Sequence, residues 1–339
     1  MLRDKFLRTI DYIRISITDR CNLRCVYCMP NNGVALIPHE NILRYEEIIS
    51  FLKIAVGSGL KKIRITGGEP LVRKNVPHLI AMIKTIIGIE DLSMTTNGIL
   101  LEEYAPQLAE AGLTRINISL DSLVPEKYRK ITRGGSIDSV FRGIKAAEQS
   151  GFAPIKINMV PIKGLNDDEI KDFARLTVDS PHQVRFIEYM PFGLKEMWRP
   201  ERFLSAERIK TIVEEVGSIV PAEVKKSGPA RYFKLDGARG VIGFISPLSN
   251  HFCHECNRLR LTADGKLRPC LFSENEIDLA PALRGRNDDE VKRLIDLSVA
   301  MKPERHPLHT LIDSRGSGHG LDHSKYFNGM RRTMSAIGG

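Results

Sequence analysis

The sequence contains few aromatic side chains and no uninterrupted apolar segment long enough to cross a membrane. Phe, Trp and Tyr make up 6% of the 339 residues, and only one Trp is present. The apolar run from 79 to 89 is interrupted by Lys84, whereas a membrane-spanning helix needs about 20 apolar residues in succession. The N-terminal residues lack the apolar core of a signal peptide, and no solenoid-length repeat or low-complexity linker occurs. We therefore expect a cytoplasmic protein that does not act at a membrane.

Acidic residues are outnumbered by basic ones. The 41 Asp and Glu residues stand against 50 Lys and Arg residues, which gives a net charge of +9. This excess favours an anionic partner, either a nucleic acid or a phosphorylated small molecule. Proteins that bind single-stranded nucleic acid interleave basic and aromatic side chains on one surface, and the scarcity of aromatic residues argues against that class. A zinc-containing nucleic-acid-binding protein is the alternative, and its signature would be bound zinc without iron.

Six cysteines are present, and they form two triplets with none left over. Three thiols cannot pair fully as disulfides, and three thiolates are one ligand short of a closed four-coordinate zinc site. The sequence therefore predicts two metal centres, each with an open position. The six predicted ligands are Cys21, Cys25, Cys28, Cys253, Cys256 and Cys270.

The spacing within each triplet is compatible with two kinds of metal. Three thiolates in a short loop can bind three irons of a cubane cluster and leave the fourth iron for an exogenous ligand. The alternative is zinc, completed by His39 or a carboxylate at the first triplet and by His251 or His254 at the second. Spacing alone does not decide between these metals.

Short β-branched runs alternate with helical patterns as far as residue 190, and this alternation predicts parallel βα units. We expect an α/β fold, an incomplete (βα)6 TIM-like barrel over residues 1–220. A C-terminal extension over 221–339 follows, and its short strands at 231–235 and 241–245 are predicted to close the open side of the barrel. The six predicted barrel strands span 12–17, 62–66, 92–96, 115–120, 155–160 and 184–189.

Side chains on a strand alternate between its two faces, so the predicted strands can be separated into an apolar set and a polar set. The apolar set, rich in Ile, must face the helices. A filled barrel carries bulky aliphatic residues inward, whereas here the inward set is polar and cationic, which predicts a charged ligand in the interior. The inward residues are Arg14, Ser16, Arg64, Thr66, Asn117, Ser119, Lys156 and Asn158.

The first cysteine loop supplies a resemblance to a known superfamily. The motif from Cys21 to Cys28, with Tyr27 before the last cysteine and the segment Gly67-Gly68-Glu69-Pro70 after the next strand, resembles the radical S-adenosylmethionine (SAM) superfamily. The resemblance implies a [4Fe-4S] cluster on this triplet, to which SAM binds and where it is cleaved to a 5′-deoxyadenosyl radical. The positions that the resemblance implies for SAM binding are Tyr27, Gly68, Glu69, Ser119 and Met190.

The second triplet narrows the resemblance. It encloses the run from Arg258 to Arg260, and the sequence ends in Gly338 and Gly339. Together these features resemble the GTP 3′,8-cyclase family of molybdenum cofactor biosynthesis. This implies a second [4Fe-4S] cluster that holds the guanine of GTP, and a glycine tail that reaches the active site. The implied GTP contacts, to which we add Arg185 from the same barrel face, are Arg14, Arg64, Thr95, Lys156, Arg185, Arg258, Leu259 and Arg260, and the expected catalytic positions are Arg14, Arg258, Arg260, Gly338 and Gly339.

The resemblance also implies a reaction and partners. The radical removes hydrogen from C3′ of GTP, and the C3′ radical adds to C8 of guanine to give 3′,8-cyclo-7,8-dihydro-GTP. Cyclic pyranopterin monophosphate synthase would convert this product, and a reducing electron donor would supply electrons. We leave open whether the chain forms a homodimer. Another twin-cluster radical SAM enzyme, such as a peptide modifier, is the alternative within the superfamily.

Overall fold

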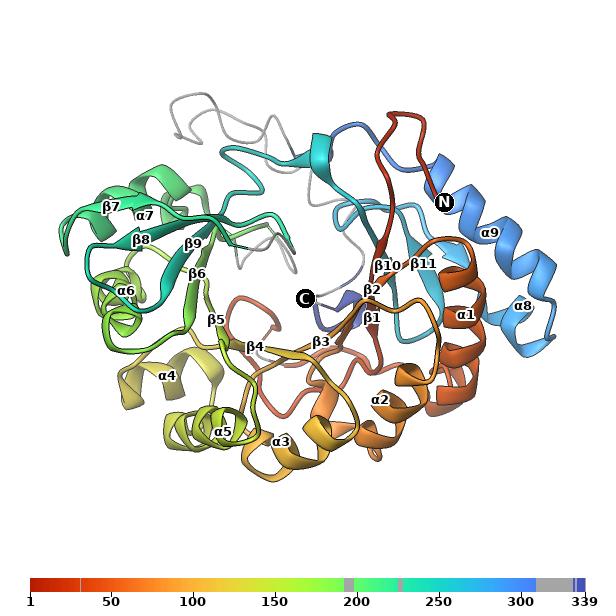
Figure 1. Cartoon of the computed structure of the whole chain (residues 1–339), viewed down its shortest axis with the longest axis horizontal. Helices are drawn as coiled ribbons and strands as arrows, with labels where there is room; N and C mark the ends of the chain where they lie inside the picture. Colours follow the sequence, from red (N-terminus) through yellow and green to blue (C-terminus); the bar gives the residue numbers. More distant parts are fainter. Residues whose placement is uncertain (31, 192–197, 225–227, 309–331, 333, 339) are drawn as a thin grey trace.

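A curved, mainly parallel sheet with helices on its outer side organises the chain (Figure 1). The computed structural model describes residues 1–30, 32–191, 198–224, 228–308, 332 and 334–338. Its central strands are β1 (Tyr12–Ser16), β2 (Lys62–Thr66), β3 (Asp91–Thr96), β4 (Arg115–Ser119), β5 (Lys156–Met159) and β6 (Gln183–Ile187). The helices along this part are α1 (Tyr45–Gly57), α2 (Val76–Lys84), α3 (Leu101–Glu110), α4 (Pro125–Thr132), α5 (Ile137–Gln149) and α6 (Ile170–Asp179).

The later part of the chain extends this sheet at both edges. Strand β9 pairs in parallel with β6, and β10 pairs in parallel with β1. The full strand order is β12-β11-β10-β1-β2-β3-β4-β5-β6-β9-β8-β7. The remaining elements are α7 (Ala206–Glu214), β7 (Ile219–Pro221), β8 (Arg231–Leu235), β9 (Val241–Ile245), β10 (Arg258–Leu261), β11 (Lys266–Arg268), β12 (Ile277–Asp278), α8 (Ala280–Arg284), α9 (Asp288–Ala300) and α11 (Met334–Ile337).

The six predicted βα strands and the incomplete barrel are confirmed. The prediction that β8 and β9 close the barrel is wrong, because they add to the β6 edge and the sheet ends at β7 and β12, which are not neighbours. The predicted boundary at residue 220 falls within β7 and stays a prediction. Within the described ranges, no helix combines the length and apolar character that crossing a bilayer requires.

The alternation along the strands explains why the barrel wall forms. Ile13, Ile15, Ile63 and Ile65 are completely buried in the core between the sheet and the outer helices. Full burial of one such side chain stabilises the fold by about 1.5–3 kcal/mol. The other face of the same strands is thereby directed inward, and it carries the polar set.

A second, smaller apolar cluster lies toward the barrel mouth. Tyr189, Trp198 and Leu248 pack in it with Ile337, which is 1% exposed, from the C-terminal helix α11. This packing brings α11, drawn in dark blue, inside the arc of strands (Figure 1). The last described turn of the chain therefore lies in the barrel interior, although it is far from β1 in sequence order.

Candidate active site

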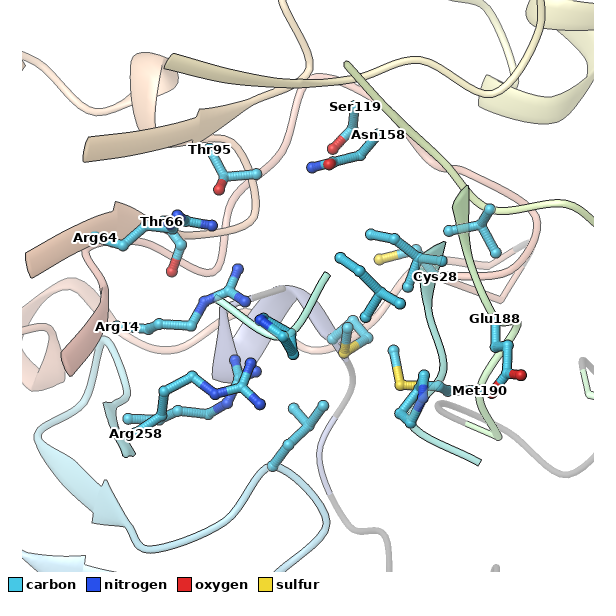
Figure 2. A pocket seen from close by; sticks show the side chains of 18 of the residues that line it. Arg14, Cys28, Arg64, Thr66, Thr95, Ser119, Asn158, Glu188, Met190 and Arg258 are labelled. Atoms are coloured by element: carbon cyan, nitrogen blue, oxygen red, sulfur yellow. The ribbon is translucent and has the colours of Figure 1, made fainter. Parts of the chain in front are cut away.

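One cavity of about 320 Å³ lies inside the curved sheet, and it brings the two cysteine triplets together. All six cysteines line it, and none of them forms a disulfide. Figure 2 shows Arg14, Arg64 and Arg258 directed into the cavity from one wall, whereas Cys28 and Met190 lie at its other side. Triplets that are more than 200 residues apart thus face one chamber, because β1 and β10 are paired neighbours.

The segment after β2 packs tightly against the start of the first cysteine loop. A Cβ atom on Gly68 would lie 2.3 Å from the carbonyl oxygen of Arg20, so only glycine fits there. The Gly68 amide donates to the Thr18 carbonyl at 2.7 Å, and the Glu69 amide donates to the Arg20 carbonyl at 2.8 Å. Gly68 therefore has a structural role in placing the cysteine loop, besides the SAM contact that the resemblance implies.

Glu69, which follows Gly68, is buried, and its carboxylate accepts three hydrogen bonds. The donors are the Thr96 hydroxyl at 2.7 Å, the Asn97 amide at 2.6 Å and the Leu71 amide at 3.1 Å. Burial outweighs these bonds and raises the pKa of Glu69 to about 7. Because Glu69 occupies the Thr96 hydroxyl, Thr95 is the threonine with a hydroxyl available to a ligand; its buried Oγ1 has no hydrogen-bond partner among the described residues.

The remaining predicted SAM positions also line the cavity. Tyr27 donates its hydroxyl hydrogen bond to Asp121, whose other carboxylate oxygen accepts the Val160 amide at 2.9 Å. Burial raises the pKa of Asp121 to about 6. Ser119 and Asn158 reach the cavity from neighbouring strands β4 and β5 (Figure 2). The buried Oδ1 of Asn158 has no hydrogen-bond partner in the described structure, so it can receive one from a ligand.

Three arginines lie side by side across strands β10, β1 and β2. Arg14 is paired in register with Arg260 on one side and with Arg64 on the other. Burial, followed by the charges of Arg260 and Arg64, lowers the pKa of Arg14 well below its usual value. Burial and the charge of Arg258 lower the pKa of Arg260 to about 9. Adjacent cations of this kind repel one another, and a polyphosphate is an anion whose oxygens match guanidinium donors well.

Lys156 and Arg185 extend this cationic face along β5 and β6. Arg185 lines the cavity and donates from Nη2 to the Asn117 side chain at 2.8 Å, and burial lowers its pKa to about 10. Lys156 lies two residues before Asn158 on β5. It is buried and does not line the cavity. Burial and the charge of Arg185 lower the pKa of Lys156 to about 7.

The electrostatic surroundings of Cys256 differ from those of the first triplet. Burial raises the pKa of Cys21 to about 11 and that of Cys28 to about 12, and nearby carboxylates add to both shifts. At Cys256 burial also opposes ionisation, but the charges of Arg258 and Lys302 outweigh it and lower the pKa to about 6. In the second triplet it is therefore the Cys256 thiolate that cations of the chain stabilise, whereas burial raises the pKa of Cys253.

The C-terminal tail connects the two sides of the cavity. The carbonyl oxygen of Gly338 accepts a hydrogen bond from Arg260, and the Ser335 backbone hydrogen-bonds the Cys28 thiol. Gly338 has φ of +73°, and a Cβ atom there would lie 2.2 Å from Thr66 Oγ1. Arg332, which precedes α11, is ion-paired with Asp264 at 2.8 Å and also with Glu276. Gly339 lies outside the described residues.

One predicted position and one missed residue complete the comparison with the sequence. The side chain of Leu259 is completely buried in the core between sheet and helices, so only its backbone faces neighbouring strands. Lys302, which no motif indicated, lines the cavity beside Cys256. It follows α9 in an irregular segment, and nothing in its spacing relates it to either triplet.

The arrangement of the thiols bears on the metal. Among the described residues, no three His, Cys, Asp or Glu side chains lie close enough together to hold one metal ion. A cubane cluster requires a different ligand spacing. Each of three cysteines binds a different iron, so the sulfur atoms are spread around the cluster. Partly buried thiols that form no disulfide and line one cavity fit this second requirement.

Comparison with known proteins identifies the family. A model of the radical SAM superfamily matches residues 15–177, and a model of Molybdenum Cofactor Synthesis C matches residues 182–308. A GTP 3′,8-cyclase from Thermodesulfovibrio yellowstonii is 52% identical over 91% of this chain and 97% of its own length. Those from Alkaliphilus oremlandii and Moorella thermoacetica are 48% and 49% identical, each over 100% of both chains. This chain belongs to the GTP 3′,8-cyclase family.

Solved structures support the fold of this GTP 3′,8-cyclase family member. Streptococcus suis SuiB bound to S-adenosylmethionine aligns with a TM-score of 0.61 over 85% of this chain and 68% of that chain, at 14% identity. A second SuiB structure aligns with a TM-score of 0.62 over 92% and 71%, at 13% identity. At such low identity the likeness concerns the fold alone. As a radical SAM protein, the chain uses SAM and [4Fe-4S] clusters as its cofactors.

Proposed function

We propose that this chain is a radical SAM enzyme that converts GTP to 3′,8-cyclo-7,8-dihydro-GTP in molybdenum cofactor biosynthesis. The observation that carries the proposal is the single cavity in which two open cysteine triplets and a row of arginines meet. GTP 3′,8-cyclases at about half sequence identity over nearly the whole chain support the same function.

The first triplet and its neighbours are assigned to SAM. With a [4Fe-4S] cluster bound, this site supplies the electron that cleaves SAM into methionine and the 5′-deoxyadenosyl radical. Tyr27, held by Asp121, borders the adenine, and the segment of Gly68 and Glu69 receives the methionyl amino group. Glu69 is suited to that task because a buried carboxylate with a raised pKa gains from a cationic partner. Ser119 and Met190 are assigned to the same ligand.

The row of arginines and the second triplet are assigned to GTP. Arg14, Arg64 and Arg260 offer several guanidinium donors to the triphosphate, whose charge compensates their mutual repulsion. Thr95 offers an unpartnered hydroxyl to the nucleotide. Arg258, beside Cys256, borders the guanine at the second site. In this proposal the ribose lies between the two triplets, where the radical and C8 of guanine are both within reach.

The partners follow from the chemistry of substrate and product. Six cysteines that must stay reduced to bind metal, together with GTP as substrate, fit the cytoplasm. The product is a cyclised nucleotide that cyclic pyranopterin monophosphate synthase can rearrange, and a low-potential reductant must supply electrons. A homodimer stays a prediction, which light scattering of the anaerobic protein tests.

The decisive experiment is anaerobic reconstitution followed by incubation with SAM, a reductant and GTP deuterated at C3′. We expect about eight irons per chain, four in each cubane, deuterium in the 5′-deoxyadenosine, and a cyclised guanine nucleotide by mass spectrometry. Deuterium-free 5′-deoxyadenosine and no cyclised product would reject the function.

The two triplets provide matched controls for this experiment. C28S and C270S should each retain about four irons, because each removes one cubane. We expect C28S to form no 5′-deoxyadenosine, and C270S to cleave SAM without cyclising GTP. Identical behaviour of the two variants would contradict the division of labour between the sites.

A further inference from the structure

Lys302 reaches the second triplet from an outer element of the fold. It follows α9, and its backbone amide continues the last turn by donating to Val299 at 3.1 Å. Its side chain extends inward to the cavity, so that the residue is only 2% exposed. A long cationic side chain is seldom buried to this degree unless partners receive its hydrogen bonds.

Three acceptors surround the Lys302 ammonium group. Nζ lies 2.8 Å from the carbonyl oxygen of Arg258, 2.8 Å from that of Pro269 and 3.6 Å from the Cys256 sulfur. An ammonium group has three N–H donors and no acceptor, so this set uses all of its donors. The three acceptors belong to the two segments that present Cys256 and Cys270, and Lys302 therefore joins these segments.

Arg8 is a second buried cation near the second cysteine triplet, and it differs from Lys302 in how its charge is balanced. Arg8 donates to the carbonyl oxygen of Cys253 at 2.6 Å, but its guanidinium is neutralised by Asp4 at 2.6 Å. Among the described residues, no carboxylate is ion-paired with Lys302, and the acceptor with anionic character in its reach is the Cys256 sulfur. The charge of Arg8 is balanced within the fold, whereas the charge of Lys302 is directed to a metal ligand.

We propose that Lys302 is a positioning residue of the second metal site, which holds the Cys256 and Cys270 segments together and, through its charge and hydrogen bond at the Cys256 sulfur, raises the reduction potential of the second cluster. The inference rests on the proposed two-cluster function. Hydrogen bonds to ligand sulfurs and the net charge around a cluster are main determinants of its potential. A cation at a ligand sulfur favours the reduced, more negative form of the cluster and so raises its potential.

The test measures the second cluster alone. In a C21S/C25S/C28S background only the second site can hold a cluster, and its potential is read from an anaerobic redox titration followed by electron paramagnetic resonance. We expect K302M to shift the potential to a more negative value. K302Q keeps a donor without the charge and should shift it less, whereas K302R should remain nearest to the unsubstituted background. K266M is the matched control, because Lys266 is a lysine of nearby β11 whose charge is balanced by Asp278.

Iron content gives a second readout on the chain with all six cysteines. If the anchoring dominates, K302M retains about four irons with a normal first-cluster spectrum and K302R restores about eight, which supports the proposal. Eight irons and an unchanged potential in both K302M and K302Q would overturn it. A shift of equal size in K266M would also overturn it, because it would reflect net charge alone. Failure of the unsubstituted chain to assemble a second cluster would instead reject the proposed function.

Discussion

Arg260 on β10 donates a hydrogen bond to the carbonyl oxygen of Gly338, which is separated from it by 78 positions in the sequence. Arg260 is also the register partner of Arg14 on β1. Gly338 therefore lies against the same cationic row that is proposed to bind the triphosphate. We therefore expect the position of the tail and the binding of substrate to depend on each other.

Gly338→Ala should reduce product formation and leave cluster assembly unchanged. A Cβ atom there would meet Thr66 Oγ1 at 2.2 Å, and the residue has φ of +73°, so the tail must shift. A misplacement of about 1 Å typically costs about 100-fold in rate. We expect such a loss in the cyclised product, measured by chromatography, with iron content unchanged.

Gly237→Ala is the matched control for this substitution. Gly237 has φ of +70°, and a Cβ atom added to it would have open space within 4 Å, so the backbone strain is similar and no site residue is touched. Product formation should remain normal. Equal losses in both variants would show that the tail contact is unimportant.

Arg332→Ala should loosen the tail without unfolding the chain. Arg332 pairs with Asp264 at 2.8 Å and with Glu276 at 2.9 Å, and Glu276 also pairs with Arg268. We expect a clear fall in the rate of GTP cyclisation, while the free energy of unfolding changes by about 1 kcal/mol or less, as is usual for partly exposed ion pairs. Full activity in R332A would contradict an anchoring role.

Arg293→Ala is the control for Arg332→Ala, because it removes an ion pair that lies away from the proposed site. Arg293 pairs with Glu290 at 2.7 Å on the exposed side of α9. Chemical denaturation and a product assay on both variants distinguish anchoring of the tail from general destabilisation. Only R332A should lose activity.

GTP binding should be accompanied by proton uptake at Lys156. The pKa of Lys156 is lowered to about 7, by burial and by the charges of Arg185, Arg115 and Arg64, with Asp91 opposing. At pH 8 the ligand-free amine is therefore mostly neutral, and a bound triphosphate favours its protonated form. Calorimetry of GTP binding at pH 8, without reductant, in two buffers of different ionisation enthalpy should reveal uptake that K156R lacks.

The same shift sets the sign of the pH dependence. Because the folded pKa lies below that of the unfolded chain, the contribution of Lys156 to stability falls as pH falls from about 10.5 to about 7. GTP affinity should move in the opposite direction and decrease as pH rises above 7. Affinity that is independent of pH between 7 and 9 would exclude a role for this proton.

Arg14→Met should stabilise the ligand-free chain and weaken GTP binding. Arg14 is half-buried between Arg260 and Arg64, and their repulsion is relieved when its charge is removed. Replacing buried charge by a packed apolar side chain is often neutral or stabilising, and we expect the melting temperature to rise by about 2 °C. Loss of charge-assisted bonds to phosphate should raise the Kd for GTP by about 10- to 100-fold.

Arg142→Met is the control for this pair of measurements. Arg142 is an exposed arginine that pairs with Glu102 at 2.8 Å. Neither the melting temperature nor GTP affinity should change measurably. A lower melting temperature in R14M together with unchanged affinity would contradict the proposed role of the arginine row.

Much of the barrel could be predicted because its signals are local. The alternation of Ile with Arg, Ser or Asn along strands reports which face is buried, and Arg14, Arg64 and Ser119 all face the cavity as predicted. Leu259 illustrates the limit of a motif. Its neighbours Arg258 and Arg260 line the cavity, but the alternation of the strand turns its side chain into the core.

Other features could not be predicted because they depend on partners distant in sequence. Lys302 belongs to no motif, and it becomes significant only because α9 ends where its side chain can reach Cys256. Likewise, β9 has the composition of an ordinary short strand. Its pairing with β6, which leaves the barrel open, follows from hydrogen bonds between segments over 50 positions apart.

Spacing and alternation in the chain determined the two cysteine triplets and the polar inner face, since both depend only on neighbouring residues. Tertiary structure alone decided that the triplets share one chamber. Parallel pairing of β10 with β1 brings Arg260 beside Arg14, and packing of α11 brings Gly338 to the same place. Both depend on burial of apolar faces that the complete fold creates, and no short stretch of sequence encodes them.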